Sequence, residues 1–194
     1  GFLAAWTDHY TFKTPKAFSC SGVDFEDTHG PVYGFERRFS TYVWNDEVTR
    51  ILQEYHDKAY THPLFLYVAM AVMHGPGEAP LVYKNWYRDR NFTNDDFIGN
   101  AMISAGDDLL GNITTMLKRY GLWNNTLLVY VSDNGGTLGG NNYPLRGAKM
   151  SHFDGGLRVV GFLNGGFLPE EARQSIDVTL LVQDVPRAPW VSAV

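Results

Sequence analysis

The stretch that decides the fold is TLLVYVSDNGG, residues 126–136. Its apolar, β-branched and aromatic run predicts a buried strand over 126–132 that stops at Asp133, Asn134 and two glycines. In open α/β sheets, ligands sit beyond the carboxyl ends of strands, so the acid and the amide stand where chemistry is expected. Glycine accepts the backbone angles of a sharp turn, which would let both side chains reach one ion. Their oxygens suit a hard cation such as Ca²⁺, and a plain Asp/Asn-Gly turn is the alternative from spacing alone.

The chain around this stretch predicts an α/β domain with a largely parallel sheet flanked by helices. A helix is expected from Asn45, as the N-terminal cap, to about residue 60, followed by a strand over 63–73. A second helix is expected over 95–120, with Gly121 as its C-terminal cap. We expect this helix to pack on one face of a sheet in which the 63–73 and 126–132 strands lie side by side. The residues of its apolar stripe are Ile98, Met102, Ala105, Leu109, Ile113 and Met116.

Composition narrows the classes of function. A length of 194 residues suits one domain, and 44% apolar with 19% charged residues is the profile of a globular chain. The net charge of −5 and the lack of clustered Lys and Arg argue against nucleic acid as a partner. No apolar run approaches the roughly 20 residues that span a bilayer. The single cysteine, Cys20, excludes an internal disulfide, and the sequence leaves the oligomeric state open.

Two further stretches carry a family resemblance. They are PLFLYVAMAVMHGP, residues 63–76, and GGNNYPLRGAKMSHFDGGLRVVGF, residues 139–162, with GLWNNT and DNGG between them. In this order they resemble the sulfatase family, and within it the arylsulfatase B-like branch, which is N-acetylgalactosamine-4-sulfatase-like. The resemblance is strongest over 63–162 and implies an alkaline-phosphatase-like sulfatase domain. It also implies a sulfuric ester hydrolase acting on sulfate esters, with sulfated glycosaminoglycans or other sulfated small molecules as substrates.

The resemblance implies a role for each matched residue. Asp133 and Asn134 would give oxygens to a Ca²⁺ that polarises the sulfate group. Lys149 would touch the sulfate oxygens and counter the charge that develops in the transition state. His74 would hydrogen-bond the sulfate or the bridging oxygen and help the alcohol leave. Arg146 is interpreted as structural, bracing the loop through bidentate contacts.

The sequence also departs from the family pattern. Sulfatases oxidise a cysteine in a Cys-x-Pro-Ser-Arg or similar motif to formylglycine, and Cys20 stands in FSCSGVD, which lacks the Pro-Ser-Arg. The nucleophile is therefore not assigned to Cys20, and the early Asp-Asp pair and the Lys-x-His motif are missing too. We expect residues 1–194 to be a partial catalytic domain, inactive in isolation, whose tail over 176–194 diverges from the family. The alternatives are a catalytically inactive, truncated sulfatase-like protein or glycan-binding remnant, and a phosphate-specific relative in the alkaline-phosphatase superfamily.

Three Asn-x-Thr triplets predict glycosylation if the protein enters the secretory route. They begin at Asn91, Asn112 and Asn124, and the last of these matches the family's own NNT. The resemblance implies a lysosomal or secreted protein, although no signal peptide is visible in this sequence.

Overall fold

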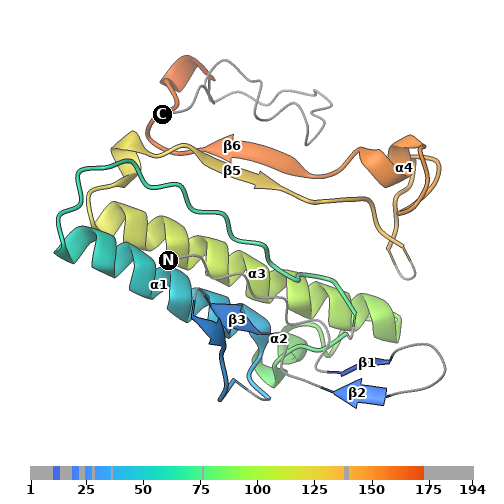
Figure 1. The fold of residues 1–194 in the computed structure, drawn as a ribbon. Coiled ribbons are helices and arrows are strands. Elements are labelled where there is room, and N and C mark those ends of the chain that lie inside the picture. The colour runs from blue at the N-terminus through green and yellow to red at the C-terminus, as the bar shows by residue number, and fades with distance from the viewer. Residues whose placement is uncertain are drawn as a thin grey trace. The chain divides into compact units, whose positions relative to one another are not determined.

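The computed structural model describes residues 11–13, 19–21, 25–27, 29–35, 37–75, 77–137 and 140–172 (Figure 1). Its contacts divide the chain into two compact units. Unit 1 comprises Gly1–Glu54 and Leu66–Ile113, and unit 2 comprises Tyr55–Phe65 and Thr114–Val194. None of the helices in the described ranges is long and apolar enough to cross a membrane.

Two long helices supply most of unit 1. They are α1 (Ser40–Asp57) and α3 (Asn94–Arg119), which run alongside each other in Figure 1, with the short α2 (Leu81–Trp86) near them. The Nδ2 atom of Asn112 on α3 donates a hydrogen bond to Oδ1 of Asn45 on α1 at 2.9 Å. Apolar side chains of the three helices form most of the core. The buried ones are Val43, Val48, Leu52, Tyr83, Ala101, Met102, Ala105 and Leu109, and Phe25 joins them from outside the helices.

The predicted second helix is confirmed as α3. It begins after Thr93, whose hydroxyl accepts a hydrogen bond from the backbone N–H of Asp96 at 3.2 Å. It ends at Arg119 and is followed by Gly121, whose φ of 71° is the left-handed conformation expected of a C-terminal cap. The backbone N–H of Leu122 then closes on the carbonyl of Leu117 at 2.9 Å, so the last turn is satisfied without side chains.

The predicted first helix starts earlier than expected. Asn45 lies inside α1, and the helix begins at Ser40. Thr41 and Val43 are buried, so the apolar face extends one turn before the position that the sequence suggested. The side-chain oxygen of Asn45, Oδ1, instead accepts the hydrogen bond from Asn112 on α3. An asparagine therefore looked like a cap because of its residue type, while burial of the preceding turn sets the helix boundary.

The strand predicted over 63–73 does not form. The segment follows an extended path in Figure 1, and none of the described residues gives it a backbone hydrogen-bond partner between residues 63 and 72. Side-chain exposure still alternates as in a strand, with Phe65 and Tyr67 exposed by 90% and 80% and their neighbours Leu66, Val68 and Met70 partly buried. The apolar run correctly indicated that alternate side chains are partly buried. A β-strand also needs a neighbouring backbone to pair with its peptide groups.

Unit 2 contains the second predicted strand. It is β5 (Leu128–Val131), which pairs antiparallel with β6 (Gly161–Asn164). In unit 1, β1 (Thr11–Lys13) pairs antiparallel with β2 (Ser19–Ser21), and so does β3 (Glu26–Asp27) with β4 (Gly30–Pro31). The parallel pairing that we expected is therefore not among the strands in the described part of the chain. The other elements of unit 2 are η1 (Trp123–Asn125), α4 (Asp154–Leu157) and η2 (Glu170–Ala172).

Candidate functional site

Asp133 and Asn134 form the turn that follows β5. The backbone N–H of Ser132 donates to the carbonyl of Val160 at 3.0 Å, which extends the β5–β6 ladder by one residue. The Ser132 hydroxyl then donates to the carbonyl of Asn134 at 3.1 Å and closes the turn. Within the described residues, neither the Asp133 carboxylate nor the Asn134 side-chain amide has a hydrogen bond or an ion pair, and Asp133 is exposed. Their oxygens are thus available to a ligand from outside the chain.

The glycines after this turn are required by a close backbone contact. The N–H of Gly135 donates to the carbonyl of Gly156 at 3.0 Å. A Cβ atom at Gly135 would lie 1.8 Å from the carbonyl oxygen of Gly155, and one at Gly155 would lie 2.2 Å from that of Gly147. No side chain fits at these distances, so DNGG and the later FDGG step have to meet backbone to backbone.

The backbone of Lys149 is also bonded to the segment that follows this turn. Its backbone N–H donates to the carbonyl of Gly136 at 3.2 Å, two residues beyond Asn134. The Lys149 ammonium, like the two oxygen side chains, has no hydrogen-bond or ion-pair partner within the described ranges. The backbone of Lys149, the predicted cation, is therefore bonded in unit 2 to the segment that directly follows the two predicted metal ligands.

Asn142 is the residue that holds this arrangement, and the sequence reading assigned it no role. Its Oδ1 atom accepts from the N–H of Gly136 at 2.9 Å. Its Nδ2 atom donates to the carbonyls of Gly136 and Gly147, at 2.9 and 3.2 Å. The amide thereby joins the segment that follows Asn134 to the segment that precedes Lys149. The sequence feature that could have indicated this role is an asparagine next to glycines in GGNN. A short amide side chain there can donate to and accept from the peptide groups of two glycine-rich segments.

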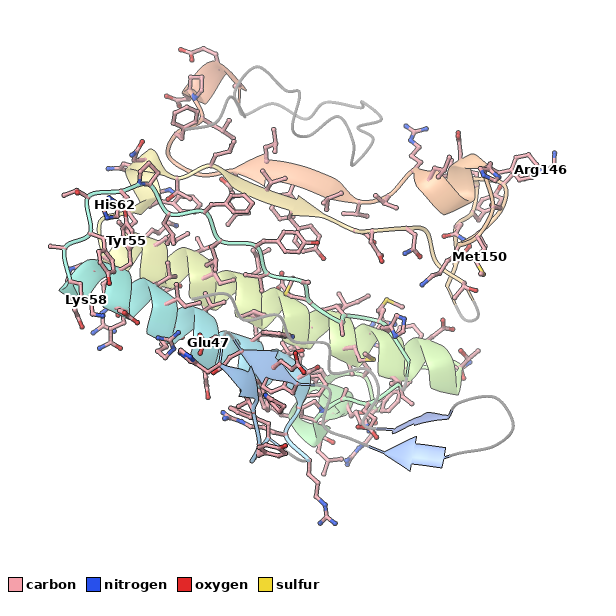
Figure 2. The ribbon with its side chains drawn as sticks, viewed as in Figure 1. Glu47, Tyr55, Lys58, His62, Arg146 and Met150 are labelled. Carbon is pink, nitrogen blue, oxygen red and sulfur yellow. The ribbon has the colours of Figure 1, made fainter. Side chains whose placement is uncertain are left out.

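Arg146 braces the loop, as predicted, but by a different contact. Its guanidinium carbon lies 4.1 Å from the centre of the Phe153 ring, a cation–π distance, and the described residues give it none of the bidentate contacts that we expected. The carbonyl of Arg146 also accepts the N–H of Gly155 at 2.8 Å. Figure 2 shows Arg146 and Met150 on this same loop.

His74 belongs to unit 1. It follows Met73, whose φ of 60° turns the chain at the end of the extended segment. Its Nδ1 atom lies 2.9 Å from the carbonyl oxygen of Gly75, and because a carbonyl only accepts, Nδ1 carries the proton in this contact. His74 is exposed, and Pro76 of the His-x-Pro turn lies outside the described residues. The convergence of His74 with the three unit 2 residues stays a prediction.

The oxygen side chains at the turn are of the type that calcium binds, but they are too few to complete a calcium site. Calcium takes six to eight oxygen ligands, and Asp133 with Asn134 offers two oxygen-bearing side chains. No group of three or more His, Cys, Asp or Glu side chains in the described part of the chain is placed to hold a metal ion. The turn is thus suited to be one part of a calcium site, with the remaining ligands supplied from elsewhere.

The three predicted glycosylation sites differ in environment. Asn91 lies in the exposed loop before α3, and Asn124 is exposed in η1. Asn112 lies within α3, and its Nδ2 atom, to which a glycan would be joined, is the donor to Asn45. All three asparagines are exposed, and their glycosylation stays a prediction.

Comparison with known proteins identifies the family of the chain. The model of the family described as Sulfatase matches residues 2–177. The chain is 38% identical to mouse arylsulfatase J over 171 residues, which is 87% of this chain and 28% of that protein. It is 30% identical to mouse N-acetylgalactosamine-6-sulfatase over 126 residues, which is 61% of this chain and 22% of that protein. The chain therefore spans about a quarter of the length of these curated relatives.

Solved structures give the same result at the level of the fold. The crystal structure of Ps i-CgsB in complex with k-i-k-neocarrahexaose aligns with a TM-score of 0.63 and 30% sequence identity, covering 70% of this chain and 29% of that one. The structure of Ps i-CgsB alone aligns with the same TM-score and 31% identity. With a family model that covers nearly all of the chain, these matches establish that the chain belongs to the sulfatase family.

Proposed function

We propose that this chain contributes part of the active site of a sulfuric ester hydrolase of the arylsulfatase type. The observation that supports this most directly is the backbone hydrogen bond from Lys149 to Gly136, which holds the Lys149 backbone against a residue two positions beyond Asn134. A sulfate ester is an anion whose hydrolysis needs positive charge and hydrogen-bond donors around the sulfur. Lys149 supplies the charge, and the neighbouring oxygens supply ligands for a metal ion that would add more.

In this proposal each residue has one task. Lys149 binds the sulfate oxygens and offsets their growing charge in the transition state. His74 donates a proton to the bridging oxygen, so that the alcohol leaves as a neutral molecule. A Ca²⁺ held in part by Asp133 and Asn134 would supply Lewis-acid polarisation of the sulfate group when bound.

We further propose that the substrate is a sulfated glycan or a related sulfated small molecule, and that the parent enzyme is arylsulfatase B-like. The motifs GGNNYPLRGAK and GLWNNT support this branch. Relatives named for N-acetylgalactosamine sulfate chemistry, and a neighbour holding k-i-k-neocarrahexaose, support a glycan substrate. A lysosomal or secreted location follows from this proposal, with Asn91 and Asn124 as the glycosylated residues.

The test compares the 194-residue chain with an extended polypeptide. In the extended polypeptide the chain is joined to an upstream segment that carries a Cys-x-Pro-Ser-Arg or similar nucleophile motif. Sulfate release from an aryl sulfate and from a sulfated sugar is measured for both. We expect turnover only in the extended polypeptide, because covalent catalysis needs a nucleophile that Cys20, without the motif, does not supply.

Variants of the extended polypeptide assign the residues. Lys149→Ala and Asp133→Ala should abolish most of the activity. The matched control is His152→Ala, which removes an exposed side chain from the same loop and should leave turnover unchanged. Robust sulfate release by the short chain, sensitive to Asp133→Ala but not to Cys20→Ala, would overturn this assignment. Binding of a sulfated glycan without turnover in the extended polypeptide would favour the alternative of a glycan-binding remnant.

A further inference from the structure

Met150 occupies an unusual backbone position beside Lys149. The N–H of Ser151 donates to the carbonyl of Ala148 at 2.9 Å, which closes a β-turn with Lys149 and Met150 as its central residues. The φ of Met150 is 72°, whereas Lys149 is not among the residues with positive φ. This combination is that of a type II turn, in which the second central position favours glycine. Here a methionine stands where glycine would relieve the strain.

The loop holds this strained residue in place. The Ser151 hydroxyl donates to the carbonyl of Ala148 at 2.7 Å and accepts from the N–H of Ala148 at 3.1 Å, so the turn is closed from both ends. The backbone bond from Lys149 to Gly136 fixes the turn against the segment that follows β5. The position of Met150 is therefore determined by its surroundings and not by its own side chain.

The Met150 side chain contributes little to the fold of the chain. The residue is 98% exposed, and among the large apolar residues of the described chain none is more exposed. A flexible, polarisable thioether suits an irregular apolar surface such as an aromatic ring or the apolar face of a sugar. The turn thus presents a cation and an adaptable apolar side chain at adjacent positions.

We propose that Met150 is a specificity residue that contacts the aryl or sugar group whose sulfate Lys149 binds. This inference rests on the proposed function and deepens it. Lys149 recognises the sulfate, which all substrates share, and Met150 recognises the organic part, which differs between them. The strain at Met150 is retained because glycine at this position would remove that contact.

The test uses three variants of the extended polypeptide. Met150→Gly and Met150→Asn both tolerate positive φ and remove the apolar side chain, whereas Met150→Leu restores an apolar one. We measure kcat and KM for p-nitrophenyl sulfate, calorimetric binding of the same compound, and inhibition by inorganic sulfate, which has no organic part. Val160→Ala, at an exposed apolar residue outside the turn, is the control.

We expect Met150→Gly and Met150→Asn to raise KM and the dissociation constant about tenfold, with kcat and sulfate inhibition nearly unchanged. Met150→Leu should keep most of the affinity of the unchanged protein, because leucine is also apolar. A change below about twofold in both variants, or an equal loss of inorganic sulfate binding, would overturn the role of Met150. Binding of p-nitrophenyl sulfate that depends on Met150 in a polypeptide without turnover would support the contact while contradicting the proposed hydrolysis. Absence of any binding would overturn both.

Discussion

The Asn142 amide makes three hydrogen bonds that join the two glycine-rich segments of the site. Asn142→Asp keeps the acceptor for Gly136 but replaces the donor to two carbonyls with a carboxylate that repels them. We expect the free energy of unfolding to fall by about 1–3 kcal/mol, measured by urea denaturation. The activity of the extended polypeptide should fall too, because Lys149 loses its fixed position.

The neighbouring Asn141 provides the control. Its Oδ1 atom accepts from the N–H of Tyr143 at 2.9 Å, and an aspartate keeps that acceptor. Asn141→Asp adds the same charge to the same loop and should leave stability within about 0.5 kcal/mol of the unchanged protein. Equal losses in both variants would show that the added charge matters and the amide does not.

His74 yields a prediction about leaving groups. If His74 donates a proton to the bridging oxygen, replacing it should lower the rate of hydrolysis most for esters whose alcohol is a poor leaving group. We expect His74→Ala to lower kcat for a sugar sulfate by about 100-fold or more, and much less for p-nitrophenyl sulfate, whose phenolate leaves readily. Equal loss on both substrates would instead indicate that His74 binds the sulfate group.

The α3 helix is held by its buried stripe. Leu109 is 2% exposed and lies in the core of unit 1. Leu109→Ala should lower the free energy of unfolding by about 3 kcal/mol through lost burial and the cavity it leaves. Ile103→Ala, on the exposed side of the same helix at 45% exposure, should change stability little. Chemical denaturation of the two variants side by side checks the prediction.

We expect the extended segment over 63–72 to make the chain prone to associate. Its peptide groups have no backbone partner among the described residues. It also exposes Phe65 and Tyr67 and carries no charge, which is the pattern of an open strand edge. We expect the 194-residue chain to form oligomers in sedimentation velocity, and Phe65→Lys with Tyr67→Lys to shift it towards the monomer. Tyr33→Lys, at a residue 67% exposed outside this segment, is the control and should not change the distribution.

Taken as a whole molecule, the chain should bind calcium weakly. Asp133 and Asn134 leave most of the coordination shell to water, so calorimetry should give a dissociation constant of about 1 mM or weaker. The extended polypeptide, which would carry the family's early Asp-Asp pair, should bind at least about tenfold more tightly. Asp133→Ala should weaken binding in both. Tight binding by the short chain would mean that residues not assigned here complete the site.

The sequence by itself determined the elements whose signal is local. The periodic stripe, the cap at Gly121 and the strand before Asp133 all follow from neighbouring residues, and α3 and β5 confirm them. The DNGG and PLRGAK motifs likewise identified the family, because such spacing depends on residue types alone. The sequence also predicted that Lys149, Asp133 and Asn134 belong to one site, and this stays a prediction, although the Lys149 backbone is bonded to Gly136, two residues after Asn134.

Only the tertiary structure decided what depends on partners distant in the sequence. The 63–73 run has the composition of a strand, yet pairing requires another backbone, and the described chain provides none for residues 63–72. The role of Asn142 and the strain at Met150 arise from contacts between loops, which no local pattern records. Burial and periodicity are properties of one segment and can be predicted from it, whereas hydrogen bonds between segments require both to be in place.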